Sequence, residues 1–168
     1  MAIIFDLDQT LIDSSAAEHL RSNRQWGTVY GMIPTLTPYE GIPELLRELE
    51  KRSIPYGIVT SSPSSYCNRV LQHWGWNTSF MVCYHDTQRR KPYPDPINLA
   101  IQKSGASSNT IISVGDDARD IEASKQAGVA SVGVLWGAKD HHKLVGSKPD
   151  YLLHSVAELT KLIEYKYF

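Results

Sequence analysis

The hydrophobic positions of this 168-residue chain fall into short apolar runs separated by amphipathic segments. The first run, residues 2–5, is made of Ala, Ile, Ile and Phe, which is typical of a buried parallel strand. Comparable runs recur along the chain, and most are bounded by Gly, Pro or hydroxyl residues. The further predicted strands cover residues 54–60, 80–84, 111–115 and 129–135, with a possible edge strand at 148–153.

The segments between these runs have apolar residues at helical spacing. Predicted helices cover residues 42–52, residues 63–74, a segment that ends at Gly105, a segment that ends at Gly128, and residues 156–163. Strands that alternate with helices indicate βαβ units with right-handed crossovers. We therefore predict an α/β fold, a three-layer doubly wound (Rossmann-like) arrangement with a mostly parallel sheet and helices on both faces. The length favours one domain over residues 1–168.

Residues 13–39 form the least regular part of the chain. A helix is expected from Ser14 toward Trp26, and Gly27, Gly31 and two prolines then interrupt the helical period. We predict a short flap here that lies over the site of the protein. Trp26 and Tyr30 are expected to face that site.

Composition and charge exclude several classes of protein. A net charge of −1 provides no basic surface for nucleic acid or for an anionic membrane. No apolar window approaches the roughly 18 residues that a membrane span needs, and Asp6 interrupts the first run, so we expect a cytoplasmic protein. Cys67 and Cys83 lack paired or metal-binding spacing and are expected to be free, buried thiols. His141 and His142 are adjacent, so their side chains would diverge on a helix, and we expect surface residues.

Polar side chains follow four of the predicted strands or their loops. Because the carboxyl ends of parallel strands lie at one edge of a sheet, where ligands bind, these side chains can converge on one pocket. From the residues alone, the acids could also solvate a strand end or cap a helix, and the hydroxyls could be ordinary N-caps. The candidates are Asp6 and Asp8, Thr60 and Ser61, Lys91, and Asp116 with Asp120.

These residues occur in motifs that resemble those of a known family. The motifs are Asp-x-Asp-x-Thr at 6–10, a hydroxyl at Thr60, Lys-Pro at 91–92 before a helix, and Gly-Asp-Asp-x-x-Asp at 115–120. Their order and strand contexts resemble the four motifs of the haloacid dehalogenase superfamily of phosphotransferases. The chain from Lys91 onward is similar to the phosphoglycolate-phosphatase-like branch. The spacing between motifs leaves room only for a reduced cap, whereas many relatives carry an inserted cap domain.

The resemblance implies a Mg²⁺-dependent phosphatase that hydrolyses phosphate monoesters. By this resemblance Asp6 is the nucleophile that forms an aspartyl-phosphate, and Asp8 is the general acid and base. The side chains of Asp6 and Asp116 and the backbone carbonyl of Asp8 would bind the Mg²⁺ ion, which prefers oxygen ligands. Relatives in that family that dehalogenate or pump ions usually lack a carboxylate at this place, so the resemblance implies that Asp8 favours phosphate hydrolysis.

The remaining candidates surround the phosphate. Thr60 and Ser61 offer a hydroxyl and backbone N–H groups to an anion, and Lys91 supplies a positive charge. Asp120 is expected either to orient a metal-bound water or to hold Lys91. For Asp117 a helix cap and a metal ligand are equally plausible.

The sequence leaves the substrate open. An open site could admit a phosphoprotein or a nucleotide, could accept many small esters, or could be closed by a second subunit. An alternative function is a non-catalytic binding module that retains the fold. A phosphorylated signalling receiver also combines acids, a hydroxyl and a lysine, but its motif order differs from the order found here.

Overall fold

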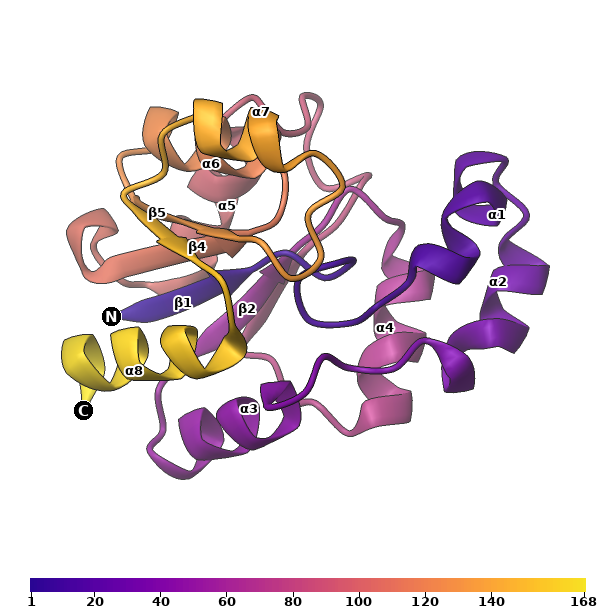
Figure 1. Cartoon of the computed structure of the whole chain (residues 1–168), viewed down its shortest axis with the longest axis horizontal. Helices are drawn as coiled ribbons and strands as arrows, with labels where there is room; N and C mark the ends of the chain where they lie inside the picture. The colour runs from indigo at the N-terminus through magenta and orange to yellow at the C-terminus, as the bar shows by residue number, and fades with distance from the viewer.

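Strand β1 (Ala2–Phe5) lies at the centre of a six-stranded sheet whose strands are all parallel (Figure 1). The computed structural model describes all 168 residues. The strand order is β3-β2-β1-β4-β5-β6. The other strands are β2 (Tyr56–Val59), β3 (Phe80–Val82), β4 (Ile111–Gly115), β5 (Ala130–Val134) and β6 (Tyr151–Leu153).

The four residues of β1 are all buried, and their side chains alternate between two separate hydrophobic clusters. Ile3 and Phe5 belong to the larger cluster, and Ala2 and Ile4 belong to the smaller one on the opposite face. A strand buried on both faces needs helices on both sides of its sheet. The continuous apolar run at the start of the chain therefore specifies a central parallel strand.

The helices form two layers. Residues of α3 (Ile42–Lys51), α4 (Ser64–Trp74) and α8 (Val156–Tyr167) join the larger cluster, and residues of α5 (Asp95–Ser104) and α6 (Ala118–Gln126) join the smaller one. Figure 1 shows α3 and α8 on one side of the sheet and α5 and α6 on the other. The predicted three-layer, doubly wound α/β fold is confirmed, with a fully parallel sheet.

Several details differ from the sequence-based expectations. A short helix, α7 (His141–Gly146), was not predicted, and it begins at Asp140, whose side chain accepts a hydrogen bond from the N–H of Lys143. Strand β2 starts at Tyr56 instead of residue 54. The histidines at 141 and 142 are exposed on α7, and both cysteines are unpaired and buried, as expected. None of the helices has both the length and the apolar surface required to cross a bilayer.

The flap, residues 13–39, differs most from its prediction. Instead of one helix toward Trp26, it contains a 3₁₀ turn (Ser15–Ala17), α1 (Glu18–Ser22), α2 (Trp26–Met32) and a second 3₁₀ turn (Ile33–Thr35). The predicted helix is interrupted because Arg24 has a left-handed conformation, with φ of 57°. Gly27 and Gly31 lie inside α2 and do not end it. Glycine lowers helix propensity without preventing a helix. No close contact requires glycine at either position, because an added Cβ would meet no atom within 4 Å.

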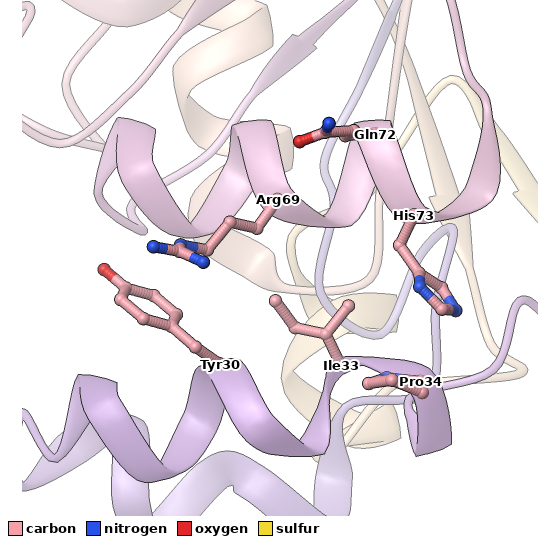
Figure 2. A pocket seen from close by; sticks show the side chains of 6 residues that line it. All are labelled: Tyr30, Ile33, Pro34, Arg69, Gln72 and His73. Atoms are coloured by element: carbon pink, nitrogen blue, oxygen red, sulfur yellow. The ribbon is translucent and has the colours of Figure 1, made fainter.

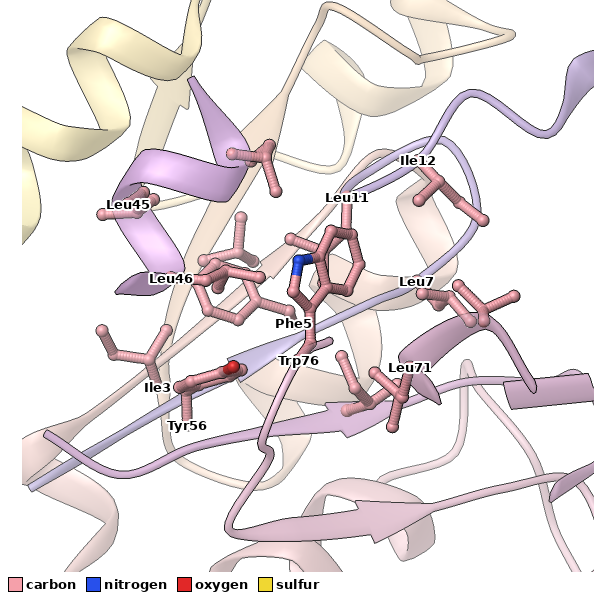
Figure 3. Close-up of a cluster of buried hydrophobic side chains, with 14 of the residues drawn as sticks. Ile3, Phe5, Leu7, Leu11, Ile12, Leu45, Leu46, Tyr56, Leu71 and Trp76 are labelled. Carbon is pink, nitrogen blue, oxygen red and sulfur yellow. The ribbon is translucent and has the colours of Figure 1, made fainter. Parts of the chain in front are cut away.

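Leu46 of α3 lies fully buried in the larger cluster, close to Phe5 and Tyr56 (Figure 3). We expect Leu46→Ala to lower the free energy of unfolding by about 2–5 kcal/mol, because the lost methyl groups leave a cavity. Urea denaturation monitored by circular dichroism measures this loss. Leu99→Ala on α5, where the side chain is only partly buried, is the matched control and should cost clearly less. Equal losses would mean that the α3 face does not form the main core.

Candidate active site at the switch point of the sheet

The polar candidates lie where the strand order reverses. Strands β1 and β4 are direct neighbours, with Phe5 opposite Val114, and the sheet extends from them in opposite directions. Such a switch point leaves a crevice at the carboxyl ends of the two strands. Asp6 follows β1 and Asp116 follows β4, so both acids emerge into this crevice. The parallel topology alone therefore brings together two acids that are far apart in the chain.

Lys91 connects the acids at the floor of the crevice. Its Nζ donates to Oδ1 of Asp6 at 2.9 Å, to Oδ1 of Asp120 at 2.5 Å and to the carbonyl oxygen of Val59 at 3.0 Å. The side chain is only 7% exposed. Burial alone would lower the pKa of Lys91, but Asp120 and Asp6 outweigh it and raise the pKa above its usual value. Lys91 is thus a permanent positive charge beside Asp6.

Gly115 permits the close approach of Asp120. A Cβ added to Gly115 would lie 2.4 Å from the Cβ, Cγ and Oδ2 atoms of Asp120. Real Cβ atoms do not approach other atoms so closely, so any other residue at position 115 would displace the Asp120 side chain. The Gly-Asp-Asp-x-x-Asp motif therefore begins with glycine because only glycine leaves space for the side chain of Asp120.

Asp116 is buried and accepts a hydrogen bond from Oγ1 of Thr10 at 2.9 Å. One oxygen from each of Asp6, Asp116 and Asp120 lies within 4.8 Å of the other two. At such separations like charges repel by roughly 3–4 kcal/mol per pair at an effective dielectric constant of about 20. Lys91 offsets part of this repulsion, and protons or a further cation must neutralise the remaining negative charge.

Burial has a strong effect on two of these acids. It raises the pKa of Asp6 to about 7, although Lys91 opposes the shift, and it raises the pKa of Asp116 to about 9, with further contributions from Asp6 and Asp120. Both groups carry a proton more readily than in water. A divalent cation between them would instead stabilise the ionised forms, which is the donor chemistry that Mg²⁺ requires.

These pKa shifts predict how stability depends on pH in the absence of metal. A carboxyl group whose pKa is raised in the folded state stabilises the fold below its unfolded pKa, and this stabilisation is lost as pH rises through the folded pKa. For Asp116 the window extends from about 4 to about 9. In EDTA, we expect wild-type protein to lose stability relative to Asp116→Asn between about pH 5 and about pH 9.

Urea denaturation of both proteins across this range measures the difference. Added Mg²⁺ should stabilise the wild type more than Asp116→Asn at the alkaline end, where the acid is ionised. Parallel stability curves for the two proteins would contradict the raised pKa.

Asp8 lies apart from the acidic cluster, and both of its oxygens face donors. Oδ1 accepts hydrogen bonds from Ser14 Oγ and from Tyr66 OH, each at 2.7 Å. Oδ2 accepts one from Ser62 Oγ at 3.0 Å and lies 3.1 Å from a guanidinium nitrogen of Arg21. Its side chain is thus not among the three clustered carboxylates, where Asp120 takes the third position. Ser14 and Arg21 come from the flap, so the flap contributes directly to the environment of Asp8.

The two hydroxyl candidates differ in their surroundings. Thr60 is buried, and its Oγ1 accepts a hydrogen bond from the N–H of Ser62 at 3.0 Å. Ser61 is exposed, and both residues line the same cavity as Asp6. Neither is the N-cap of α4, because that position is Pro63. The hydroxyl that contacts an acid is instead that of Ser62.

Asp117 caps α6. Its side chain accepts a hydrogen bond from the N–H of Arg119 at 2.9 Å, and its own N–H donates to Oδ2 of Asp120 at 3.1 Å. This reciprocal capping box satisfies free N–H groups at the helix start. Of the two expected roles for Asp117, the structure therefore shows the cap, and Asp120 contacts Lys91 while it completes the same box.

A polar cavity of about 660 Å³ lies over these residues. It includes every predicted site residue: Asp6, Asp8, Thr60, Ser61, Lys91, Asp116 and Asp120. Its volume is in the range of small-molecule sites. Gly137 in the wall lies against the first loop, and a Cβ there would be 1.9 Å from the carbonyl oxygen of Gln9.

The expectation for the flap aromatics is correct for Trp26 and wrong for Tyr30. Trp26 lines the cavity. Tyr30 lies on the other side of α2, where its hydroxyl is 2.7 Å from Ser65 Oγ and its ring lies beneath the guanidinium of Arg69. Figure 2 shows Tyr30 with Ile33 and Pro34 facing α4 across a separate cavity of about 300 Å³. On this side α2 contacts α4.

Trp136 packs against the larger hydrophobic cluster and also lines the cavity. Its Nε1 donates to the carbonyl oxygen of Thr10 at 3.0 Å, which fixes the ring at the wall.

Comparison with known proteins shows the family of this chain. A model of haloacid dehalogenase-like hydrolases matches residues 23–134, a range that contains Thr60, Lys91, Asp116 and Asp120. The chain belongs to the haloacid dehalogenase-like hydrolase family. A crystal structure of a hydrolase from Pseudomonas syringae superposes on this haloacid dehalogenase-like chain with a TM-score of 0.83 at 20% identity, over 98% of both chains.

Two curated relatives of this haloacid dehalogenase-like protein are phosphatases. The phosphoglycolate phosphatase of Xylella fastidiosa is 36% identical over 144 residues, which are 84% of this chain and 61% of that protein. The N-acetylmuramic acid 6-phosphate phosphatase of Pseudomonas aeruginosa is 36% identical over 102 residues, which are 60% of this chain and 45% of that protein. The chain thus spans about half of the length of such relatives, and their substrates are properties of those longer proteins.

Proposed function

We propose that this chain is a Mg²⁺-dependent phosphatase that hydrolyses phosphate monoesters through an aspartyl-phosphate on Asp6, with Asp8 as the general acid and base. The observation that supports it best is the convergence of Asp6, Lys91 and Asp116 on one polar cavity at the switch point of the sheet. Residues 1–168 would act as one domain, and residues 13–39 would serve as a reduced cap.

The proposed reaction has two steps. First, a carboxylate oxygen of Asp6 forms a bond to phosphorus while the bond to the alcohol oxygen breaks, and Asp8 donates a proton to that oxygen. Second, Asp8 takes a proton from a water whose oxygen attacks phosphorus, and the bond to Asp6 breaks to release inorganic phosphate. Lys91 neutralises the carboxylate and the phosphoryl oxygens throughout, because it is held within 2.9 Å of Asp6.

Asp8 requires a change of partners before it can transfer a proton. Both oxygens already accept from donors, so at least one donor must leave before the carboxyl group can carry a proton toward a substrate. Arg21 and Ser14 belong to the flap, whereas Tyr66 and Ser62 belong to the core. Movement of the flap would therefore release Asp8, while Tyr66 and Ser62 keep it oriented.

The residues present fit a divalent metal ion. The carboxylates of Asp6, Asp116 and Asp120 offer three hard oxygen ligands close together, and burial makes the negative charges of Asp6 and Asp116 costly. A bound Mg²⁺ would supply charge neutralisation for the phosphoryl group. We propose Asp6 and Asp116 as side-chain ligands together with the backbone carbonyl of Asp8, and Asp120 as the residue that holds Lys91.

A phosphate-ester screen with and without Mg²⁺ tests the proposal. We expect purified protein to release inorganic phosphate from some members of a broad panel when Mg²⁺ is present, and to lose this activity in EDTA. Restoration by Mg²⁺ after EDTA is the control for damage by the chelator. If no ester in the panel is hydrolysed with Mg²⁺, the alternative of a non-catalytic binding module would replace the phosphatase.

A further inference from the structure

The charges that line the cavity are unequal in number. Seven carboxylates face four positively charged side chains. The carboxylates are Asp6, Asp8, Asp13, Glu18, Asp116, Asp117 and Asp120, and the cations are Arg21, Lys91, Arg119 and Lys139. One divalent ion at the floor would reduce the negative excess without reversing it. The cavity can therefore accept the phosphate of a substrate at the metal, but it has no net positive charge for a second anion.

Each of the four cations already contacts a carboxylate. At the floor Lys91 contacts Asp6 and Asp120. Toward the flap Arg21 lies 3.1 Å from Asp8. The Nε of Arg21 has no partner, so a substrate carboxylate that bound this guanidinium would share it with Asp8.

The mouth of the cavity is lined by Asp13, Glu18, Arg119 and Lys139, and its two cations also contact carboxylates. Lys139, in the segment after β5, lies 2.7 Å from Glu18 of the flap, and Arg119 lies 2.9 Å from Asp117. Asp13 adds a carboxylate that accepts hydrogen bonds only from the N–H and hydroxyl of Ser15. A leaving group that carries its own carboxylate would therefore meet Asp13 and Glu18, and it would share Lys139 or Arg119 with an acid of the protein.

The uncharged part of the lining suits a hydroxyl-bearing leaving group. The Gln9 side-chain oxygen accepts from the N–H of Ser14 at 2.8 Å, which leaves the amide N–H groups of Gln9 as donors. Ser15 and Ser22 add hydroxyls, and Trp26 and Trp136 add aromatic surface. Polar groups that converge between aromatic walls are typical of sites for small polar molecules.

We propose that the substrate is a phosphate monoester of an uncharged polyol, such as a sugar, and that the mouth discriminates against esters with a second negative group. This inference rests on the proposed function and specifies its substrate class. It also separates the chain from phosphatases of anionic esters, because carboxylates outnumber cations in the lining and each cation already contacts an acid of the protein.

Matched pairs of esters test the proposal by binding, independently of turnover. The pairs are 2-hydroxyethyl phosphate with phosphoglycolate, glycerol 3-phosphate with 3-phosphoglycerate, and glucose 6-phosphate with 6-phosphogluconate. Titration calorimetry with the Asp6→Asn protein, at a Mg²⁺ concentration that saturates this variant, measures Kd for each compound without hydrolysis. We expect the uncharged member of the best-bound pair to bind about tenfold tighter or more, which corresponds to about 1.4 kcal/mol.

Equal or tighter binding of the carboxylate members would overturn the inference, and so would the absence of binding by all six compounds. Turnover of the same compounds by wild-type protein tests the proposed function separately. A binding preference without any phosphate release would refute the phosphatase but would retain the ligand class.

A charge-neutralising variant tests whether the mouth causes the preference. Glu18→Gln frees Lys139, so we expect the Kd ratio between carboxylate and uncharged esters to fall by about threefold or more. Glu44→Gln is the matched control, because Glu44 forms a comparable surface pair with Arg47 on α3, away from the cavity. An unchanged Kd ratio in Glu18→Gln, or an equal change in Glu44→Gln, would show that the charges at the mouth do not cause the preference.

Discussion

Asp6→Asn is expected to abolish phosphate release, because an amide cannot form the acyl-phosphate bond on which both steps depend. The protein should remain folded, since Lys91 keeps its contacts with Asp120 and with the carbonyl of Val59. Colorimetric phosphate assays at saturating ester and Mg²⁺ measure the loss, and urea denaturation verifies the fold. With radiolabelled ester and acid quenching, wild-type protein should carry hydroxylamine-labile phosphate, whereas Asp6→Asn should carry none.

Asp140→Asn is the matched control for this substitution. Asp140 caps α7 outside the cavity, and asparagine is an equally good cap, so activity should equal that of the wild type. Turnover by Asp6→Asn at the wild-type rate would exclude the covalent mechanism.

Asp8→Asn is expected to lower kcat by roughly a hundred- to ten-thousand-fold, the usual contribution of general acid–base catalysis. An amide can neither protonate the leaving alcohol nor activate water. With an ester whose leaving group needs no proton, the first step should be less impaired than the second, so labelled aspartyl-phosphate should accumulate. The acid-quench experiment thus distinguishes the two acids, because Asp8→Asn retains the label that Asp6→Asn lacks.

A stability measurement must accompany this variant. In Asp8→Asn the introduced amide N–H₂ group would face a donor such as Tyr66 or Ser62, and an unsatisfied polar group in this position costs about 1–3 kcal/mol. Tyr66→Phe removes one of these donors and provides a second variant with altered stability but an intact acid. If Tyr66→Phe lost as much activity as Asp8→Asn, the effect would come from the hydrogen-bond network and not from proton transfer by Asp8.

The sequence predicted the sheet and the convergence of its acids because both follow from local patterns. An apolar run such as residues 2–5 implies a buried parallel strand, and parallel strands present their carboxyl ends at one edge. That rule places Asp6 beside Asp116 without any knowledge of side-chain contacts. Lys91 also reaches the cluster, although its loop follows β3 at the edge of the sheet.

The partners of Asp8 could not be predicted in the same way. Tyr66 lies on the apolar face of α4, and its position in the sequence predicts only a core residue. The hydrogen bond from its hydroxyl to Asp8 is visible only in the structure. Arg21 lies on a short helix whose ends depend on a left-handed residue at position 24, which no periodicity indicates. Ser62 was available as one of three consecutive hydroxyl residues, but the pattern does not tell which of them faces an acid.

The close contact at Gly137 has a consequence for variation of this protein. A side chain there would collide with the backbone of Gln9 and with the hydroxyl of Tyr39, 2.6 Å from the added Cβ. Gln9 directly follows Asp8, so a larger residue would push the first motif away from its partners. A saturation library at position 137, selected for folded protein, should therefore recover glycine alone.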